Sequence, residues 1–390
     1  MSDQPPTESA GRLISLDVFR GITIAGMVLV NNPGSWAAVY TPLDHAEWNG
    51  WTPTDFIFPF FIFIVGISIT LALGRRVETG GVTPDVYWKI CKRAAIIFLL
   101  GLFLAAFPFW DFSKNTFVDF STLRVMGVLQ RIAICYLVAS LIFIRTNWKT
   151  QTVIAVVLLF VYWALLKLVP IPGCAAEVVA SFDDKACNLP AYLDRIILGD
   201  NHIWRGGKVY DPEGLLSTLP AIATALAGVL TGHWLRSKRS DLEKCGGLFF
   251  AGVAGVMIGY VWNGWFPINK SLWTSSYVVF MAGMALCLLA FCYWLIDIKN
   301  YRRWAQVFVI FGVNALALFF FSGILARILN LIKWTGADGK AISLQKWIFE
   351  TFFAPLAAPI NASLFYAVCY IFFWLFLMWL LYRKRIFIKV

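Results

Sequence analysis

Charged residues are scarce in this chain: only 14% of its 390 residues are Asp, Glu, Lys or Arg, whereas 59% are hydrophobic. Ordinary soluble domains are about 25% charged, so this composition excludes a water-soluble protein. There are only three histidines, and no CxxC pair or His/Cys cluster occurs, which argues against a metal site. The sequence also lacks GxxxxGK[ST] and a strand-borne GxGxxG, so an ATP-driven pump is unsupported.

Long hydrophobic runs make up most of the sequence. A membrane-spanning helix needs about 20 mostly apolar residues. The candidate spans are residues 14–31, 55–73, 94–109, 124–144, 150–169, 217–235, 247–266, 273–296, 305–325 and 362–382. Residues 347–358 are apolar too, but Pro355 and Pro359 shorten that run, so it is predicted as an interfacial or re-entrant helix. We predict an all-α, polytopic membrane bundle with about ten transmembrane helices.

The domain organisation is expected to be simple. Residues 1–11 form a polar tail without the features of a removable signal peptide, and residues 12–390 form a single transmembrane domain. The Lys and Arg residues behind the net charge of +11 gather in alternate connections between the runs. The positive-inside rule places these connections and both termini in the cytoplasm. The loops 32–54, 110–123, 170–216 and 326–361 then face outward, and no nucleic-acid partner is expected.

Two of the eight cysteines, Cys174 and Cys187, fall in the outward loop 170–216. In an oxidising compartment a disulfide between them is expected, with two unpaired thiols as the alternative. The bridge would close a loop of roughly 15 residues and contribute about 3 kcal/mol in the chain-entropy model.

The densest polar segment, residues 44–55, lies between two hydrophobic runs. His45 has carboxylates around it, and a carboxylate on one imidazole nitrogen leaves the other free as base or nucleophile. A polar loop histidine without a chemical role is the alternative. Asp55 also has two interpretations, because it could orient His45 or cap the helix that follows. Trp48 is suited to anchor this segment at the membrane interface.

Further polar residues lie inside or beside the runs, where a charge costs roughly 2.5–3.5 kcal/mol and needs a reason. Asp17 and Arg20 share a helical face, which indicates an internal ion pair or a ligand site. Arg131 lies deep in the fourth run and needs a carboxylate or phosphate partner. Helix capping or hydrogen bonding between helices is the alternative role for Asp211, Glu213, Ser275, Ser276 and Asn314. Physical chemistry alone fits a transporter and a membrane-embedded transferase equally well.

Six motifs together point to a family. They are Leu-Asp-x-Phe-Arg-Gly at 16–21, His-Ala-x-Trp-Asn-Gly at 45–50, Gly-Val-Leu-Gln-Arg at 127–131, Asp-Pro-Glu-Gly at 211–214, Asn-Lys-Ser-Leu-Trp at 269–273 and Gly-Val-Asn-Ala at 312–315. In these motifs the chain resembles the heparan-α-glucosaminide N-acetyltransferase family, over about residues 12–382.

The resemblance implies transmembrane acetylation: cytoplasmic acetyl-CoA gives its acetyl group to an amino sugar across the membrane. The family's active-site histidine falls on His45 and its nearby asparagine on Asn31. Asp55 would orient the imidazole, and Asn31 and Asn49 would stabilise the oxyanion. An acetyl-histidine intermediate and direct transfer to the amine are both open at this point.

The remaining expected site residues form two groups. Coenzyme A phosphates need cations and hydrogen-bond donors; the candidates are Arg20, Arg124, Gln130, Arg131, Lys270, Ser275, Ser276, Tyr277 and Asn314. The candidates for the amino sugar are Asp44, Glu47, Trp48, Asp211 and Glu213. No metal is expected.

The form of the family also bears on substrate and location. Animal members have an extra lumenal domain and an added span before the first motif, where this sequence has only residues 1–11. The chain therefore resembles the bacterial core version, expected in an inner membrane and acting on a free amino sugar or short cell-wall sugar. The alternative function is a transporter for N-acetylglucosamine or a related sugar. The oligomeric state is open, and a homodimer is one of the options.

Overall fold

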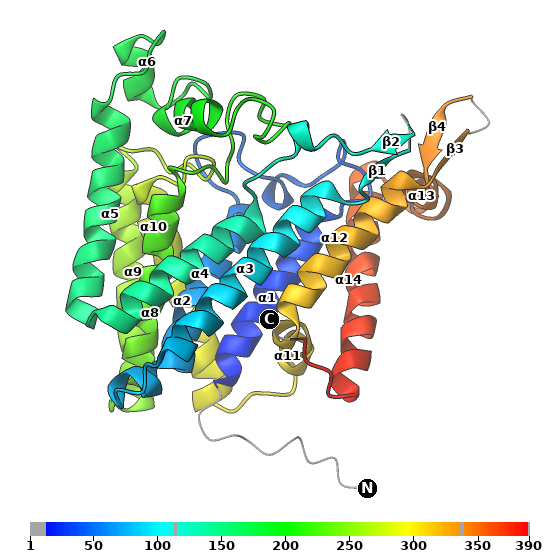
Figure 1. Ribbon diagram of the computed structural model, residues 1–390. Helices are drawn as coiled ribbons and strands as arrows, with labels where there is room; N and C mark the ends of the chain where they lie inside the picture. Colours follow the sequence, from blue (N-terminus) through cyan, green and yellow to red (C-terminus); the bar gives the residue numbers. More distant parts are fainter. Residues whose placement is uncertain (1–12, 113–114, 336–338, 389–390) are drawn as a thin grey trace, which may run out of the picture.

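The computed structural model describes residues 13–112, 115–335 and 339–388, most of which are helical (Figure 1). The predicted tail of residues 1–11 lies outside the described residues. The long helices are α1 (Ile14–Asn31), α2 (Ile57–Glu78), α3 (Pro84–Ala106), α4 (Val128–Arg145), α5 (Trp148–Leu168), α8 (Thr218–Arg236), α9 (Asp241–Trp262), α10 (Ser275–Cys292), α12 (Ala315–Leu331) and α14 (Pro359–Arg383). The shorter ones are α6 (Ala176–Ser181), α7 (Leu189–Ile197), α11 (Gln306–Val313) and α13 (Leu344–Ile348).

Two small antiparallel hairpins, which the sequence did not predict, lie in the connections. β1 (Trp110–Asp111) pairs with β2 (Thr116–Phe117), and β3 (Lys333–Thr335) pairs with β4 (Ala341–Ser343). The predicted short helix at 347–358 is found as α13 followed by single helical turns that end at Leu356, just before α14.

The prediction of an all-helical polytopic bundle is confirmed. In the described part of the chain, eight helices are long and apolar enough to cross a membrane, or nine if the bent pair α11–α12 is one span. The predicted tenth span, 94–109, corresponds to α3. That helix begins ten residues earlier, and its first turns carry Lys89, Lys92 and Arg93, so only its second half is strongly apolar. It nevertheless packs along α4 in the bundle.

The predicted straight span 305–325 is instead broken at Asn314. Helices α11 and α12 meet there at 78°. The Asn314 side chain donates to the backbone oxygen of Ile386 (3.1 Å) and accepts from the backbone N–H of Ile388 (2.9 Å). The segment after α14 therefore folds back onto this bend.

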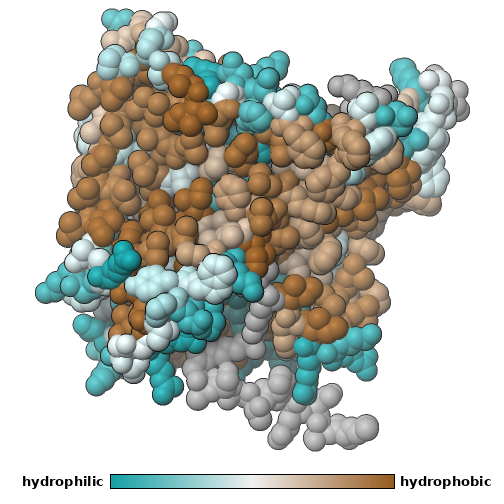
Figure 2. Space-filling model, viewed as in Figure 1, coloured by the Kyte–Doolittle hydropathy of each residue, from teal (hydrophilic) through white to brown (hydrophobic). Residues whose placement is uncertain are grey.

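The four loops predicted to lie on one side of the membrane gather at one end of the bundle, at the top of Figure 1. We call this the loop end, formed by the described residues of 32–54, 110–123, 170–216 and 332–358. Helix α1 begins and α14 ends at the opposite, basic end. Figure 2 shows a broad hydrophobic band between hydrophilic residues at the two ends, which is the surface expected of a membrane protein.

Small residues allow the closest helix contacts. A Cβ atom on Gly66 of α2 would lie 1.9 Å from the Ala225 backbone oxygen of α8, and one on Gly228 would lie 2.0 Å from the Phe63 oxygen. Such small-residue seams let helix backbones approach closely in membranes, where van der Waals packing takes the place of the hydrophobic effect. The α2–α8 seam holds α2, the helix that follows Asp55, closely against α8.

Candidate active site

His45 lies in the loop end with its imidazole against Asp55. Its Nδ1 is 2.7 Å from Asp55 Oδ1, and about half of its side chain (48%) is exposed, whereas that of Asp55 is 1% exposed. If Nδ1 carries the proton and donates to the carboxylate, Nε2 is the basic nitrogen. In this arrangement the buried Asp55 carboxylate orients the imidazole, and Nε2 is the nitrogen that can react.

Asp55 also caps the helical turn Pro53–Phe56 that leads into α2. Its Oδ2 accepts from the backbone N–H groups of Ala46 (3.1 Å) and Thr52 (2.9 Å). The Asp55 backbone oxygen accepts from the hydroxyl of Tyr277 on α10 (2.7 Å). Both interpretations of Asp55 thus describe its contacts: one carboxylate oxygen serves the cap, and the other contacts His45.

Lys270 completes this cluster from a distant part of the sequence. Its Nζ lies 2.9 Å from His45 Nδ1, 3.1 Å from Nε2 and 3.4 Å from Asp55 Oδ1. Burial lowers the pKa of Lys270 from its usual value, while Asp55 and Glu213 oppose that shift. From the sequence, Lys270 is predicted to contact a phosphate group of coenzyme A. Lys270 lies in a connection predicted to face outward, where the positive-inside rule disfavours lysine. That unusual position is the feature of the sequence that could have indicated a functional role.

Two loops are tied together around the cluster. Asn49 and Asn269 form an isolated antiparallel bridge, and Asn269 Nδ2 donates to Asn49 Oδ1 (3.1 Å). Asn49 Nδ2 in turn donates to Asp183 Oδ1 (2.6 Å). The side chain of Asn49, predicted to stabilise the oxyanion, therefore holds the loops together in this structure. Trp48 is buried, and its Nε1 donates to the Phe182 backbone oxygen (2.7 Å). It anchors the segment in the protein core rather than at the membrane surface.

The loop that receives Trp48 is itself closed by a disulfide. Cys174 and Cys187 are bonded, with 13 residues of sequence separation. Asp183, the partner of Asn49, lies inside this closed loop. The bridge therefore restrains a wall of the candidate site.

A second charged cluster lies beside the first. Arg124 donates to both oxygens of Asp211, Nε to Oδ2 at 2.9 Å and Nη2 to Oδ1 at 2.5 Å, and it also donates to Glu213. Burial raises the pKa of Glu213, but Arg124, Arg131 and Lys270 outweigh it and the net shift is downward. The expected sugar-binding acids are thus paired with an expected phosphate-binding arginine. Through Lys270, Glu213 couples this cluster electrostatically to His45 and Asp55.

Arg131, in the first turn of α4, is fully buried. Its Nη2 donates to the Gly214 backbone oxygen (3.0 Å) and to Ser217 Oγ (2.5 Å), and its guanidinium stacks over Trp273 at 5.0 Å. Nε and Nη1 of Arg131 have no hydrogen-bond partner among the described residues. A buried cation with two free donors is suited to an anionic group.

Asp194 of α7 is a buried acid that the sequence did not single out. Its Oδ1 accepts from the Leu215 backbone N–H (2.8 Å), and its Oδ2 has no partner within the described chain. Burial raises the pKa of Asp194 to about 7. The group therefore titrates in the physiological range.

Several other predicted donor-binding residues make contacts within the bundle. Ser275 Oγ donates to the Leu159 backbone oxygen (2.7 Å), and Ser276 Oγ lies 3.2 Å from the Thr274 hydroxyl. Arg20 donates to Asp17 and to Ser68, each at 3.1 Å, which matches the ion-pair interpretation. Gln130 is buried. Their roles toward a ligand stay predictions.

The remaining predicted residues, Asn31, Asp44 and Glu47, do not join the His45–Asp55–Lys270 cluster. Asn31 is the exposed last residue of α1 and makes no hydrogen bond to His45, Asp55 or Lys270 in the described structure. Asp44 is exposed, and its Oδ1 accepts from the His45 backbone N–H (2.8 Å). Glu47 is exposed as well. The two acids place negative charge at the mouth of the site.

Taken together, the fold and this cluster define a multi-pass membrane protein with a polar, titratable site at one end of its helical bundle. Within the described residues no group of three or more His, Cys, Asp or Glu side chains could hold a metal ion. An oriented imidazole with an ammonium group beside it can carry out proton transfer or nucleophilic attack.

Comparison with known proteins identifies the family. Residues 12–249, more than half of the chain, match the family model of the heparan-alpha-glucosaminide N-acetyltransferase catalytic domain, and the chain belongs to this family. It is 26% identical over 435 residues to heparan-alpha-glucosaminide N-acetyltransferase of Mus musculus, covering 99% of this chain and 62% of that protein. It is 29% identical over 335 residues to the Homo sapiens enzyme, covering 74% of this chain and 49% of that one. The alignments thus cover about half to three-fifths of these relatives.

Proposed function

We propose that this protein is a transmembrane acetyltransferase that moves the acetyl group of acetyl-CoA to the amine of a sugar at the loop end. The observation that carries the proposal is the His45–Asp55–Lys270 cluster, an oriented imidazole beside a lysine in a bundle of this family. In our proposal the acetyl donor comes from the basic end. The acceptor is a free or short amino sugar, and the membrane is a bacterial inner membrane.

Asp55 would set the direction of proton transfer. With Nδ1–H donating to Asp55 Oδ1, Nε2 of His45 takes the proton from the attacking amine. The amine nitrogen forms a bond to the thioester carbon, the carbon–sulfur bond breaks, and the departing thiolate takes up a proton. An acetyl-histidine route makes the same demand on Nε2, because that nitrogen would then carry the acetyl group before the amine does.

Lys270 would supply positive charge where the thioester oxygen becomes negative. Its Nζ is 3.1 Å from Nε2, so it lies near the atom at which bonds change. Asn49 is engaged by Asp183 and Asn269, so we assign this electrostatic role to Lys270, together with Asn31 as the family resemblance implies.

The donor and acceptor would approach different groups. The two unpartnered nitrogens of buried Arg131 fit a phosphate oxygen of coenzyme A better than any other predicted donor-binding group. Exposed Asp44 and Glu47 beside His45 are suited to attract a protonated amino sugar before it loses its proton.

A direct assay tests the proposal. Purified protein in detergent is mixed with radiolabelled acetyl-CoA and a panel of amino sugars, and the acetylated sugar is measured. We expect product with at least one glucosamine-type sugar, and no product with His45→Ala. Sugar uptake into vesicles without acetyl-CoA, retained in His45→Ala, would instead identify a transporter.

A further inference from the structure

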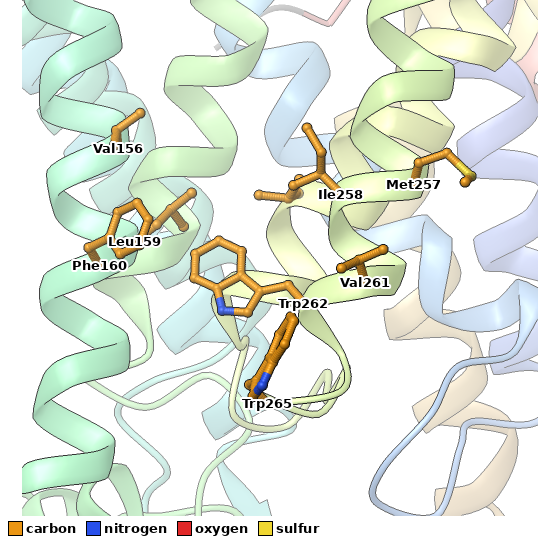
Figure 3. A pocket seen from close by; sticks show the side chains of 9 residues that line it. Val156, Leu159, Phe160, Met257, Ile258, Val261, Trp262 and Trp265 are labelled. Carbon is orange, nitrogen blue, oxygen red and sulfur yellow. The ribbon is translucent and has the colours of Figure 1, made fainter.

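A hydrophobic groove runs along the membrane-spanning face between α5 and α9. It has a volume of about 620 Å³, and its nine lining side chains are all hydrophobic (Figure 3). Val156 and Phe160 come from α5, Met257 and Trp262 from α9, and Val279 from the first turns of α10. The groove plays no part in the acetyl transfer proposed above.

The groove exists because its walls pack on different neighbours. Helix α5 packs against α8, while α9 packs closely on α10. A Cβ on Gly259 would lie 2.5 Å from the backbone nitrogen of Phe280, so α9 is drawn onto α10 by small residues. The face of α10 at Val279 is left recessed between the two lipid-facing helices.

The surroundings of the groove identify its occupant. Only 17% of the α9 span and 28% of the α5 span are buried in the protein, so both helices face hydrocarbon. Trp262 and Trp265 lie at the loop end of α9, where indoles favour the interface of the membrane. We propose that the groove binds an acyl chain of a membrane lipid from the leaflet on the loop-end side.

Trp262 of the groove wall directly precedes the loop that carries Lys270. The Trp262 ring contacts Phe160 (centroids 5.3 Å apart) and Trp163 (5.6 Å). Beyond α9, Asn263 Oδ1 accepts from the Ile268 backbone N–H (2.7 Å), which orders the loop 263–274. That loop carries Lys270 to His45. A bound chain therefore stabilises the loop as well as filling the groove.

Photolabelling tests the proposal without relying on catalysis. The full chain is reconstituted in phosphatidylcholine bilayers doped with a phosphatidylcholine whose acyl chain carries a diazirine, and labelled peptides are mapped by mass spectrometry. We expect labelling of α5 and α9 at the groove to exceed that of exposed Phe372 and Phe376 on α14 by at least fivefold. Equal labelling of all lipid-facing helices would overturn the proposal.

A matched pair of variants makes the test specific. Val156→Trp fills the groove and is expected to remove the excess label and to speed amide exchange in residues 263–274. Val157→Trp, on an exposed neighbour (50%) outside the groove lining, should change neither. Unchanged labelling in Val156→Trp would overturn the proposal.

Discussion

Replacement of Asp55 by Asn tests the site most sharply, because it alters charge with almost no change in shape. In the folded protein Oδ2 of Asp55 accepts two backbone N–H groups, while Oδ1 faces His45 Nδ1 at 2.7 Å. The single oxygen of Asn is needed at the backbone N–H groups of Ala46 and Thr52. Its NH2 group then points at Nδ1, which must become an acceptor, and the proton moves to Nε2.

The expected loss follows from that tautomer. The corresponding Asp→Asn change in a serine protease triad lowers kcat about 10⁴-fold, because the imidazole is held in the wrong form. We expect a loss of about 10³- to 10⁴-fold in kcat for Asp55→Asn, or about 4 to 5.5 kcal/mol of transition-state stabilisation. The KM for acetyl-CoA should change little, since Asp55 contacts none of the three predicted donor-binding arginines (Arg20, Arg124 and Arg131) in the described structure.

The measurement is the initial rate of thiol release from acetyl-CoA with a saturating amino sugar, for protein in detergent. Asp297→Asn is the matched control: it replaces a largely buried carboxylate near the basic end, which accepts from the Ser15 backbone N–H (3.2 Å). It should keep near-normal turnover. If folded Asp55→Asn retains more than about a tenth of wild-type kcat, the reasoning about the tautomer is wrong.

Three further predictions concern stability, each measured as thermal unfolding in detergent. Arg124→Leu leaves Asp211 and Glu213 buried without their cation and should cost about 3 to 5 kcal/mol; a loss below 1 kcal/mol would contradict the ion-pair geometry. Because the pKa of Asp194 is raised to about 7, the folded state holds a proton that the unfolded chain releases near pH 4, so stability should fall as the pH rises through this range. Asp194→Asn should remove that fall, and an unchanged pH profile would refute the assignment. Gly66→Ala should cost about 1 to 3 kcal/mol because its Cβ meets the α8 backbone, whereas Gly246→Ala, with open space around it, should be neutral.

Much of the fold was predictable because membrane insertion leaves a strong trace in sequence. The apolar runs located the helices, and the distribution of Lys and Arg grouped the loops that lie together at one end of the bundle. The break at Asn314 was not predicted, because the run 305–325 is apolar apart from Gln306, Asn314 and Ser322, and the bend depends on contacts with residues 386 and 388. The start of α3 at Pro84 was not predicted either, because the basic residues of its first turns are typical of a connection between spans.

The site was predictable only in part. His45 and Asp55 are ten residues apart, so their crowding is visible in the sequence. Lys270 is 225 residues from His45, and tertiary contacts such as the Asn49–Asn269 bridge and the Tyr277–Asp55 hydrogen bond bring the two together. The ion pairs of Arg124 with Asp211 and Glu213 also join distant segments. The hydrophobic pattern of the sequence locates the helices but does not show which distant side chains pair.

The central claim is that the protein uses His45 to transfer an acetyl group from acetyl-CoA at the basic end to an amino sugar at the loop end. It is tested most directly in proteoliposomes of known orientation, with labelled acetyl-CoA supplied at the basic end and glucosamine trapped at the loop end. The account predicts N-acetylated sugar inside the vesicles for the wild type and none for His45→Ala. Sugar that crosses the membrane unmodified, or product formed equally well by His45→Ala, would contradict it.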